Sequence, residues 1–243
     1  QSLRQVVVEG NSATAGIIRG ELTEGTASMF GTALPVVQQG VAEGALVIGT
    51  PANSAAIRGL GWQTELTALG PEGYRIRAAR IGNRQVTAVA SDGEIGALYG
   101  AYHFLRLLQT GQPIDRLDIT ERPKVQLRML NHWDNMNGTI ERGYAGRSLW
   151  QWNELPGTLS PRYVDYARAN ASLGINGVSL NNVSSRPEML LPAWIAKASR
   201  SQPSPSLGNT RSIGAPLALL ALPRYSNEMP TTYSPAAAML QGL

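Results

Sequence analysis

The hydrophobic positions in the first half of the chain predict alternating strands and helices. Two short apolar runs, QVVVEG (5–10) and GALVIGT (44–50), are rich in β-branched residues and are closed by glycine, as buried strands are. The segment GYRIRAARIG (73–82) alternates between apolar and polar residues, and QVTAVAS (85–91) follows it after a Gly-Asn turn. This pair predicts a β-hairpin with one covered face.

A helix is predicted directly after the hairpin. Asp92 can cap its N-terminus, and TGQP (110–113) ends it. Between them, apolar residues recur at helical spacing on one side: Ile95, Leu98, Tyr99, Tyr102, Leu105 and Leu108. His103 lies beside this stripe, where we expect a packed, hydrogen-bonded structural histidine in preference to a ligand. Residues 1–115 therefore predict a mixed α/β N-terminal domain.

Pro123 marks a change of pattern, because proline lacks the N–H that a central strand would use. We therefore predict a linker over 116–124. Beyond it, VQLRMLN (125–131) is strand-like and a long connection follows. Ser160–Pro161 is typical of the N-cap and first position of a helix, and Gly174 is a natural residue to end that helix.

The pattern continues with a second strand at INGVSLNNV (175–183) and a second helix at PEMLLPAWIAKAS (187–199), which Pro192 kinks or starts afresh. Residues 125–199 thus predict the first two β/α units of a parallel sheet or of a (β/α)8 barrel. The tail, 200–243, is rich in Pro and Ser and has neither the helical nor the strand period. We expect it to be disordered, or aberrant through a reading-frame change.

Composition narrows the function classes. Hydrophobic residues make up 43% of the chain and charged residues 16%, which is typical of globular proteins. The net charge of +4 is slight and is not clustered, so no nucleic-acid partner is expected. No apolar run reaches the about 20 residues that span a membrane, so no membrane partner is expected either. The absence of cysteine excludes disulfides and Cys-based zinc sites, and the first residues, QSLRQ, indicate a processed or truncated start.

The stretch RMLNHWDNMNGTIERGYAGRSLWQW (128–152) is the candidate site. Residues that follow the carboxyl end of a parallel strand line the ligand-binding face, and the connection 132–159 is 28 residues long where about two to six are typical. Indole faces stack on sugar rings, while Asp, Asn and Arg bind hydroxyls and carboxylates. Trp133 fits the core as well as a ligand, and at least one of Trp150 and Trp152 is expected to contact ligand.

The charged residues of this stretch have two interpretations. Asp134 and Glu141 fit a catalytic carboxylate pair, but their spacing is not diagnostic. A buried ion pair with Arg128 or Arg142 is the favoured interpretation for either. His132 and Asp134 alternate on one face, but the chain has only one other histidine, and we expect no metal site.

The stretch 128–152 closely resembles the start of the catalytic barrel of the glycoside hydrolase family 67 α-glucuronidases. GINGVSLNNV (174–183) is similar to the second strand of that barrel, and SDGEIGALYGAYHFLRLLQTG (91–111) to the closing helix of the preceding α/β domain. The resemblance spans roughly residues 5–199. It implies hydrolysis, with inversion and without a cofactor, of the α-1,2 link between (4-O-methyl-)glucuronic acid and xylo-oligosaccharides.

The resemblance also implies which residues bind substrate. Trp150 forms a wall near the C4 side of the uronic acid, and the rest of the predicted substrate-binding set is Trp133, Asp134, Glu141, Arg142 and Asn182. No catalytic residue can be assigned, because the acid and base carboxylates of the family lie on later barrel strands. We therefore expect a fragment that is inactive alone and poorly folded beyond residue 120.

An alternative is a non-catalytic carbohydrate-binding or scaffold protein that keeps the α/β domain and the tryptophan loop. A hexosaminidase-like hydrolase draws support only from ALYGAYHFLRLLQ (97–109). The resemblance implies glucuronic-acid-substituted xylo-oligosaccharides as partners and leaves a homodimer of the full-length enzyme open. Family members work outside the cell, in the periplasm or in the cytoplasm. We expect an extracellular or periplasmic location for this protein, with a cytoplasmic one as the alternative.

Overall fold

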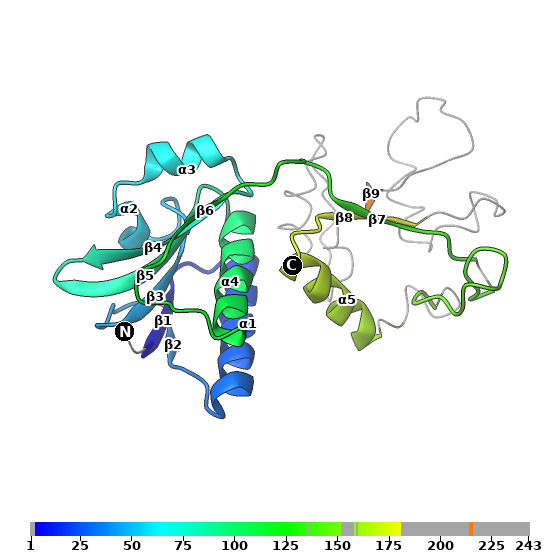
Figure 1. Ribbon diagram of the computed structural model, residues 1–243, viewed down its shortest axis with the longest axis horizontal. Coiled ribbons are helices and arrows are strands. Elements are labelled where there is room, and N and C mark those ends of the chain that lie inside the picture. Colours follow the sequence, from blue (N-terminus) through cyan, green and yellow to red (C-terminus); the bar gives the residue numbers. More distant parts are fainter. Residues whose placement is uncertain (1–2, 136, 152–157, 159, 181–213, 216–243) are drawn as a thin grey trace. The chain divides into compact units, whose positions relative to one another are not determined.

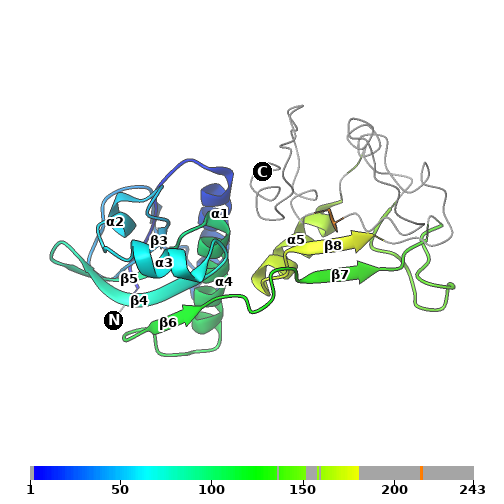
Figure 2. The same cartoon turned by 90° about the horizontal axis from the view of Figure 1, so that it is seen from above.

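The computed structural model describes residues 3–135, 137–151, 158, 160–180 and 214–215 (Figures 1 and 2). The chain divides into two compact units, Gln1–Gln126 and Leu127–Leu243. Each unit is built on its own sheet. Among the described residues, no helix is long and apolar enough to cross a membrane.

The first unit contains a six-stranded sheet with the strand order β2-β1-β3-β5-β4-β6. Its strands are β1 (Gln5–Val8), β2 (Val36–Val37), β3 (Ala45–Gly49), β4 (Tyr74–Ile81), β5 (Arg84–Ser91) and β6 (Asp118–Glu121). The first three and β5 run parallel, whereas β4 is antiparallel to both β5 and β6. The predicted strands at 5–10 and 44–50 and the hairpin at 73–82 and 85–91 are confirmed.

Strand β6 corrects the predicted linker. Residues 118–121 lie inside the segment 116–124, yet they pair with β4 from Arg77↔Asp118 to Tyr74↔Glu121. This strand is at the edge of the sheet, and most of its side chains are exposed. An exposed edge strand needs no apolar run and is protected by charged residues, which is why the sequence pattern did not predict it.

Helices cover both faces of this sheet (Figure 1). The helices α1 (Ala13–Phe30) and α4 (Glu94–Gln109) pack against each other on one face. The shorter helices α2 (Ala55–Arg58) and α3 (Gln63–Leu69) cover the other face, where Ile57 and Leu66 join a core that includes Val47 and Ala88. The mixed α/β domain predicted for the N-terminal part is confirmed.

Helix α4 begins one residue later than predicted. Its N-cap is Gly93, no side chain caps it, and the carboxylate of Asp92 instead accepts hydrogen bonds from Gln63 (2.9 Å) and Thr67 (3.2 Å). The turn before the helix is too tight for a side chain, since a Cβ on Gly93 would lie 2.3 Å from the carbonyl oxygen of Pro71.

Two further glycines let α4 lie directly on the sheet. A Cβ on Gly96 would lie 2.1 Å from Ser91 Oγ, and a Cβ on Gly100 would lie 2.4 Å from Val89 Cγ1. Contacts this short force the backbone apart. The helix-to-sheet distance in the first unit is therefore set by residues that have no side chain.

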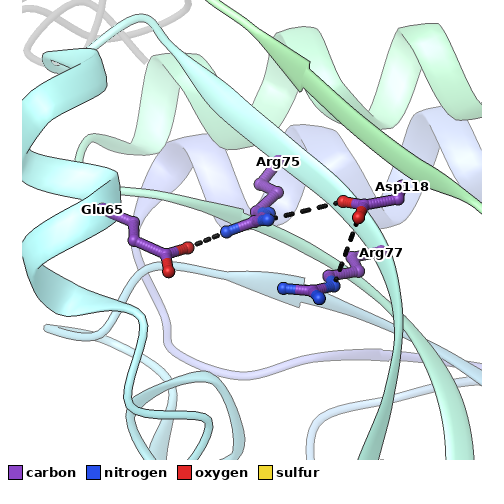
Figure 3. Close-up of polar contacts among 4 residues, drawn as sticks. All are labelled: Glu65, Arg75, Arg77 and Asp118. Atoms are coloured by element: carbon purple, nitrogen blue, oxygen red, sulfur yellow. Dashed lines mark hydrogen bonds and ion pairs between the residues drawn. The ribbon is translucent and has the colours of Figure 1, made fainter.

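A charged network ties α3 and β6 to β4 on the opposite face (Figure 3). Arg75 pairs with Glu65 and with Asp118 (3.4 Å), and Arg77 reaches the same Asp118 carboxylate at 3.7 Å. The two guanidinium groups lie 5.6 and 5.9 Å from the ring centroid of Trp62. Partly exposed ion pairs of this kind stabilise a fold by only about 0.5 kcal/mol each. The network therefore adds little to the stability of the sheet edge, which depends mainly on strand pairing.

His103 packs against Tyr74 on the α4 face, as expected of a structural histidine. The Tyr74 hydroxyl lies 2.9 Å from His103 Nδ1, and the rings meet edge to face. Burial, followed by the charge of Glu121, raises the pKa of Tyr74 to about 12 against the opposing effect of Arg106. Burial and Arg106 lower the pKa of His103, against the effect of Glu121. The phenol therefore keeps its proton and donates a hydrogen bond to the neutral imidazole.

The second unit has the strand order β7-β8-β9. Strands β7 (Met129–His132) and β8 (Gly177–Leu180) are parallel and are joined through α5 (Pro161–Ser172). The predicted start of α5 is confirmed, because Ser160 Oγ accepts a hydrogen bond from the backbone N–H of Arg162. Gly174, with a φ of 73°, follows the helix end in the left-handed conformation.

Beyond residue 180, the structure describes only strand β9, residues 214–215. The predicted helix 187–199 and most of the tail 200–243 lie outside the described residues. Strand β9 (Gly214–Ala215) pairs antiparallel with β8. A (β/α)8 barrel requires a parallel neighbour at each strand, so β9 is not the next strand of a barrel.

We predict that Gly96→Ala lowers the free energy of unfolding of the first unit by about 2 kcal/mol, because the added methyl group overpacks the α4 contact. Gly20→Ala is the matched control, since Gly20 is exposed on α1 with nothing within 4 Å of its Cβ position. The control should raise stability by about 1 kcal/mol. Urea dependence of amide exchange in β3 and β5 measures both, and equal effects would contradict the packing argument.

The Tyr74–His103 pair predicts two pH limits for the first unit. Because the pKa of His103 is lowered on folding, stability falls as the pH drops through about 6.5, where the unfolded histidine takes up a proton. Because the pKa of Tyr74 is raised to about 12, stability also falls above about pH 10. In urea titrations across this range, His103→Gln should remove the acidic loss alone and Tyr74→Phe the alkaline loss alone.

Candidate substrate-binding loop

The connection between β7 and α5 is folded on itself. This segment, which we call the 133–151 loop, leaves the end of β7 in green in Figure 1. Its two isolated β-bridges join Asp134 to Ile140 and Thr139 to Arg147. Hydrogen bonds from the N–H of Glu141 to the carbonyl of Trp133 (2.7 Å) and from the N–H of Ser148 to the carbonyl of Gly138 (2.9 Å) close the turns. The described part of the predicted long loop therefore has a defined internal pairing.

The position of this loop suits a binding site. It begins at the carboxyl end of β7, beside the parallel strand β8, and this end of parallel strands is where α/β folds bind ligands. Two predicted contributors, Trp152 and Asn182, lie outside the described residues.

Trp150 is enclosed by aromatic side chains. It is 2% exposed, and its indole stacks on Tyr163 with ring centroids 5.3 Å apart. Tyr166 and His132 each meet the indole edge to face at 5.6 Å. Such aromatic pairs add roughly 0.5–1.5 kcal/mol each beyond the burial of area. The end of the loop is thereby anchored to α5 and to β7, through an indole that is part of the core in this structure.

Asp134 is buried as well, at 3% exposure. Its Oδ1 lies 3.4 Å from His132 Nδ1. Burial raises the pKa of its carboxyl, but hydrogen bonds with His132 and Ser148 and the charge of His132 outweigh that effect, and the pKa lies below its usual value. No ion pair between Asp134 and Arg128 or Arg142 is found among the described residues, so that expectation is wrong for Asp134; its charged neighbour is the histidine two residues before it.

The outer side of the loop carries the residues that are open to solvent. Trp133 is 51% exposed, and Glu141 and Arg142 are exposed at the tip. Glu141 has a φ of 54°, which only a tight turn imposes on a non-glycine residue. Its carboxylate is hydrogen-bonded to the hydroxyl of Tyr144, which raises the pKa of that tyrosine. The loop therefore presents an aromatic face together with both signs of charge.

The structure separates the predicted residues into two groups. Asp134 and Trp150 lie inside the loop, whereas Trp133, Glu141 and Arg142 lie on its outer side. Sequence analysis missed Tyr163 and Tyr166, although their spacing of three on α5 signals that both point the same way. No group of three or more metal-binding side chains occurs among the described residues.

The first unit also contains a position at which α/β sheets commonly bind ligands. At the carboxyl ends of β1 and β3 the chain turns to helices on opposite faces, which is where α/β sheets form a binding crevice. Here three hydrogen-bond donors are already bound by two glutamates of the same unit. Glu9 accepts from the N–H of Ala55 (2.5 Å), and Glu94 accepts from Ser12 Oγ and Asn53 Nδ2, both at 2.7 Å.

We predict that Trp150→Ala destabilises the second unit by about 3–5 kcal/mol, the range for deleting a fully buried aromatic side chain. Trp133→Ala is the matched control and should change stability by no more than about 0.5 kcal/mol, because the side chain is half exposed. Amide exchange in β7 and α5 measures both variants. Equal loss of protection would show that the aromatic cluster does not anchor the loop.

Comparison with known proteins places these units in a family. The models of the glycosyl hydrolase family 67 N-terminus and of the glycosyl hydrolase family 67 middle domain match residues 1–104 and 107–202, respectively. Probable alpha-glucuronidase A from Aspergillus oryzae is 39% identical over 128 residues, 52% of this chain and 15% of that protein. Alpha-glucuronidase A from Aspergillus tubingensis is 34% identical over 128 residues, 52% of this chain and 14% of that protein.

A solved structure shares the fold. A family GH115 4-O-methyl-alpha-glucuronidase with specificity for decorated arabinogalactans matches with a TM-score of 0.50 and 15% identity, over 74% of this chain and 25% of that chain. The match to the curated relatives covers no more than 15% of their length. The resemblance carried by the stretch 128–152 is confirmed, since the two family models match in succession along the chain. The chain belongs to glycosyl hydrolase family 67.

Proposed function

We propose that the chain supplies the N-terminal domain and the first substrate-binding loop of an α-glucuronidase. The reaction is hydrolysis, with inversion, of the α-1,2 link between (4-O-methyl-)glucuronic acid and xylo-oligosaccharides. The observation that carries this proposal is the ordered 133–151 loop at the carboxyl end of β7, in a chain that belongs to family 67.

The outer side of the loop has the chemistry that an acidic sugar requires. The exposed face of Trp133 stacks on a sugar ring, and the Arg142 guanidinium pairs with the uronic carboxylate through two parallel hydrogen bonds. Glu141 accepts from sugar hydroxyls. Trp150 forms the wall beneath this surface, and Asn182 adds a polar contact after β8.

Asp134 shapes the pocket and does not serve as the general acid. The general acid of an inverting glycosidase needs a raised pKa so that it carries a proton to the leaving oxygen. The pKa of Asp134 is lowered, and its carboxylate already accepts from His132. We assign the acid and the base to carboxylates other than Asp134 and Glu141.

The substrate class also bears on location and partners. Xylo-oligosaccharides arise from an extracellular plant polymer, so we place the protein outside the cell or in the periplasm. Its partners are then the acidic oligosaccharides themselves, with neither nucleic acid nor a membrane required.

Titration calorimetry of the 243-residue chain with 4-O-methylglucuronosyl-xylotriose tests this proposal, with xylotriose as the uncharged control ligand. We predict that the acidic oligosaccharide binds at least about tenfold more tightly, and that Arg142→Gln removes this preference, since a charged hydrogen bond contributes about 1.5–3 kcal/mol. Arg116→Gln, at an arginine that is 94% exposed in the first unit, is the matched control. Equal affinity for both ligands would contradict the uronic-acid assignment.

The same samples separate an enzyme part from a carbohydrate-binding protein. The chain should release no glucuronic acid, because its loop carboxylates are not the acid and base. Release by the wild-type chain that is lost in Asp134→Asn would show that the assignment of Asp134 is wrong.

A further inference from the structure

His132 lies at the centre of a polar chain that joins three segments. Its Nδ1 lies 3.4 Å from Asp134 Oδ1, and its Nε2 lies 2.6 Å from the Tyr166 hydroxyl. His132 ends β7, Asp134 belongs to the loop and Tyr166 belongs to α5. The imidazole is therefore the one group among these three that contacts both the loop carboxylate and the helix.

The ends of this chain fix its hydrogen-bond directions. Asp134 is an ionised acceptor, because its pKa lies below the usual value. Burial raises the pKa of Tyr166, so its phenol keeps its proton, although a hydrogen bond with Asn170 acts in the opposite direction. With Asp134 as the acceptor, the imidazole donates from Nδ1, and its Nε2 lies within hydrogen-bond distance of the Tyr166 hydroxyl. Both imidazole nitrogens are thus used.

The hydrogen-bonded series Asp134–His132–Tyr166 also links two of the aromatic side chains that enclose Trp150. His132 and Tyr166 both meet the indole edge to face, and their own rings are 5.5 Å apart. Loss of the hydrogen bond between them would free two of the three aromatic neighbours of Trp150. The hydroxyl oxygen of the third neighbour, Tyr163, accepts a hydrogen bond from the backbone N–H of Gln151 (2.8 Å).

The contact between His132 and Asp134 also determines the direction of the Trp133 side chain. Its two neighbours, His132 and Asp134, both point inward and bond to each other, so the strand alternation directs Trp133 outward. The carbonyl of Trp133 accepts from the N–H of Glu141 at 2.7 Å, which places Arg142 one residue further along the same turn.

We propose that His132 is a positioning residue of the substrate-binding loop. Through its two hydrogen bonds it holds Trp150 beneath the loop and presents Trp133 and Arg142 on the outer side. His132 itself does not touch the substrate. This inference rests on the proposed function only in saying that an acidic sugar is what the presented residues bind.

Three substitutions in the 243-residue chain separate the two hydrogen bonds of His132 from its shape. His132→Asn keeps a donor near the position of Nδ1, facing Asp134. His132→Gln keeps a polar group near the position of Nε2, facing Tyr166. His132→Phe keeps an aromatic ring and removes both bonds. His103→Gln, at the other histidine of the chain, is the matched control.

Two measurements without ligand report separately on the two hydrogen bonds of His132. Proton exchange of the Trp150 indole N–H, assigned with Trp150→Phe, reports the cage. The carboxyl ¹³C shift of Asp134 against pH, assigned with Asp134→Asn, reports the loop contact. We expect His132→Gln to keep slow exchange but raise the pKa of Asp134, and His132→Asn to keep the low pKa but speed exchange by about tenfold. His132→Phe should show both changes, and the control neither.

The crossed pattern distinguishes positioning from space filling. If His132 only fills space, His132→Phe is the best tolerated variant and leaves both measurements unchanged, which overturns the inference. If His132→Phe does not fold, the opposite responses of the Asn and Gln variants still decide, and identical responses overturn it. Failure of the wild-type chain to bind 4-O-methylglucuronosyl-xylotriose overturns the proposed function alone.

Discussion

The burial of one indole is the interaction on which the second unit depends. Trp150 joins the end of a long loop to the strand before it and to the helix after it, since its three aromatic neighbours come from β7 and α5. A loop of this length pays a large entropic cost for being ordered, and its internal hydrogen bonds are close in free energy to those that it would make with water. The aromatic contacts, with the area they bury, supply the difference. The exposed residues of the loop are then held in place without being buried themselves.

The first unit reaches its stability by a different route. Its central helix approaches the sheet at glycines, so the backbone itself forms the close contact and the apolar side chains around it can pack on both sides. Charged contacts at the edge of the sheet, such as those of Arg75, are more numerous than they are strong. The polar pair of Tyr74 and His103 is a third case, because it keeps both rings neutral in a half-buried position.

Local patterns predicted the elements whose cause is local. Ser160, Pro161 and Gly174 specify both ends of α5 through their own backbone chemistry, and the alternation at 73–91 specifies the hairpin. Helix α1 was missed, because its glycines at 16, 20 and 25 obscure a period that Ala15, Ile18 and Leu22 still carry. The site was predicted as a segment, but its internal pairing was not. Which partner Asp134 takes depends on contacts within a folded loop, and the sequence analysis favoured an arginine where the structure has His132.

The crevice at the carboxyl ends of β1 and β3 has a consequence for an acidic sugar. In many α/β sheets this edge attracts anions, because helix N-termini place unpaired N–H groups there. Here Glu9 accepts from the N–H of Ala55 at the start of α2, and Glu94 accepts from the side chains of Ser12 and Asn53. An anion that reaches this edge meets the negative charge of these two carboxylates, and the donors named here are already taken. At this edge, two acidic side chains therefore occupy donors that a bound anion would otherwise use.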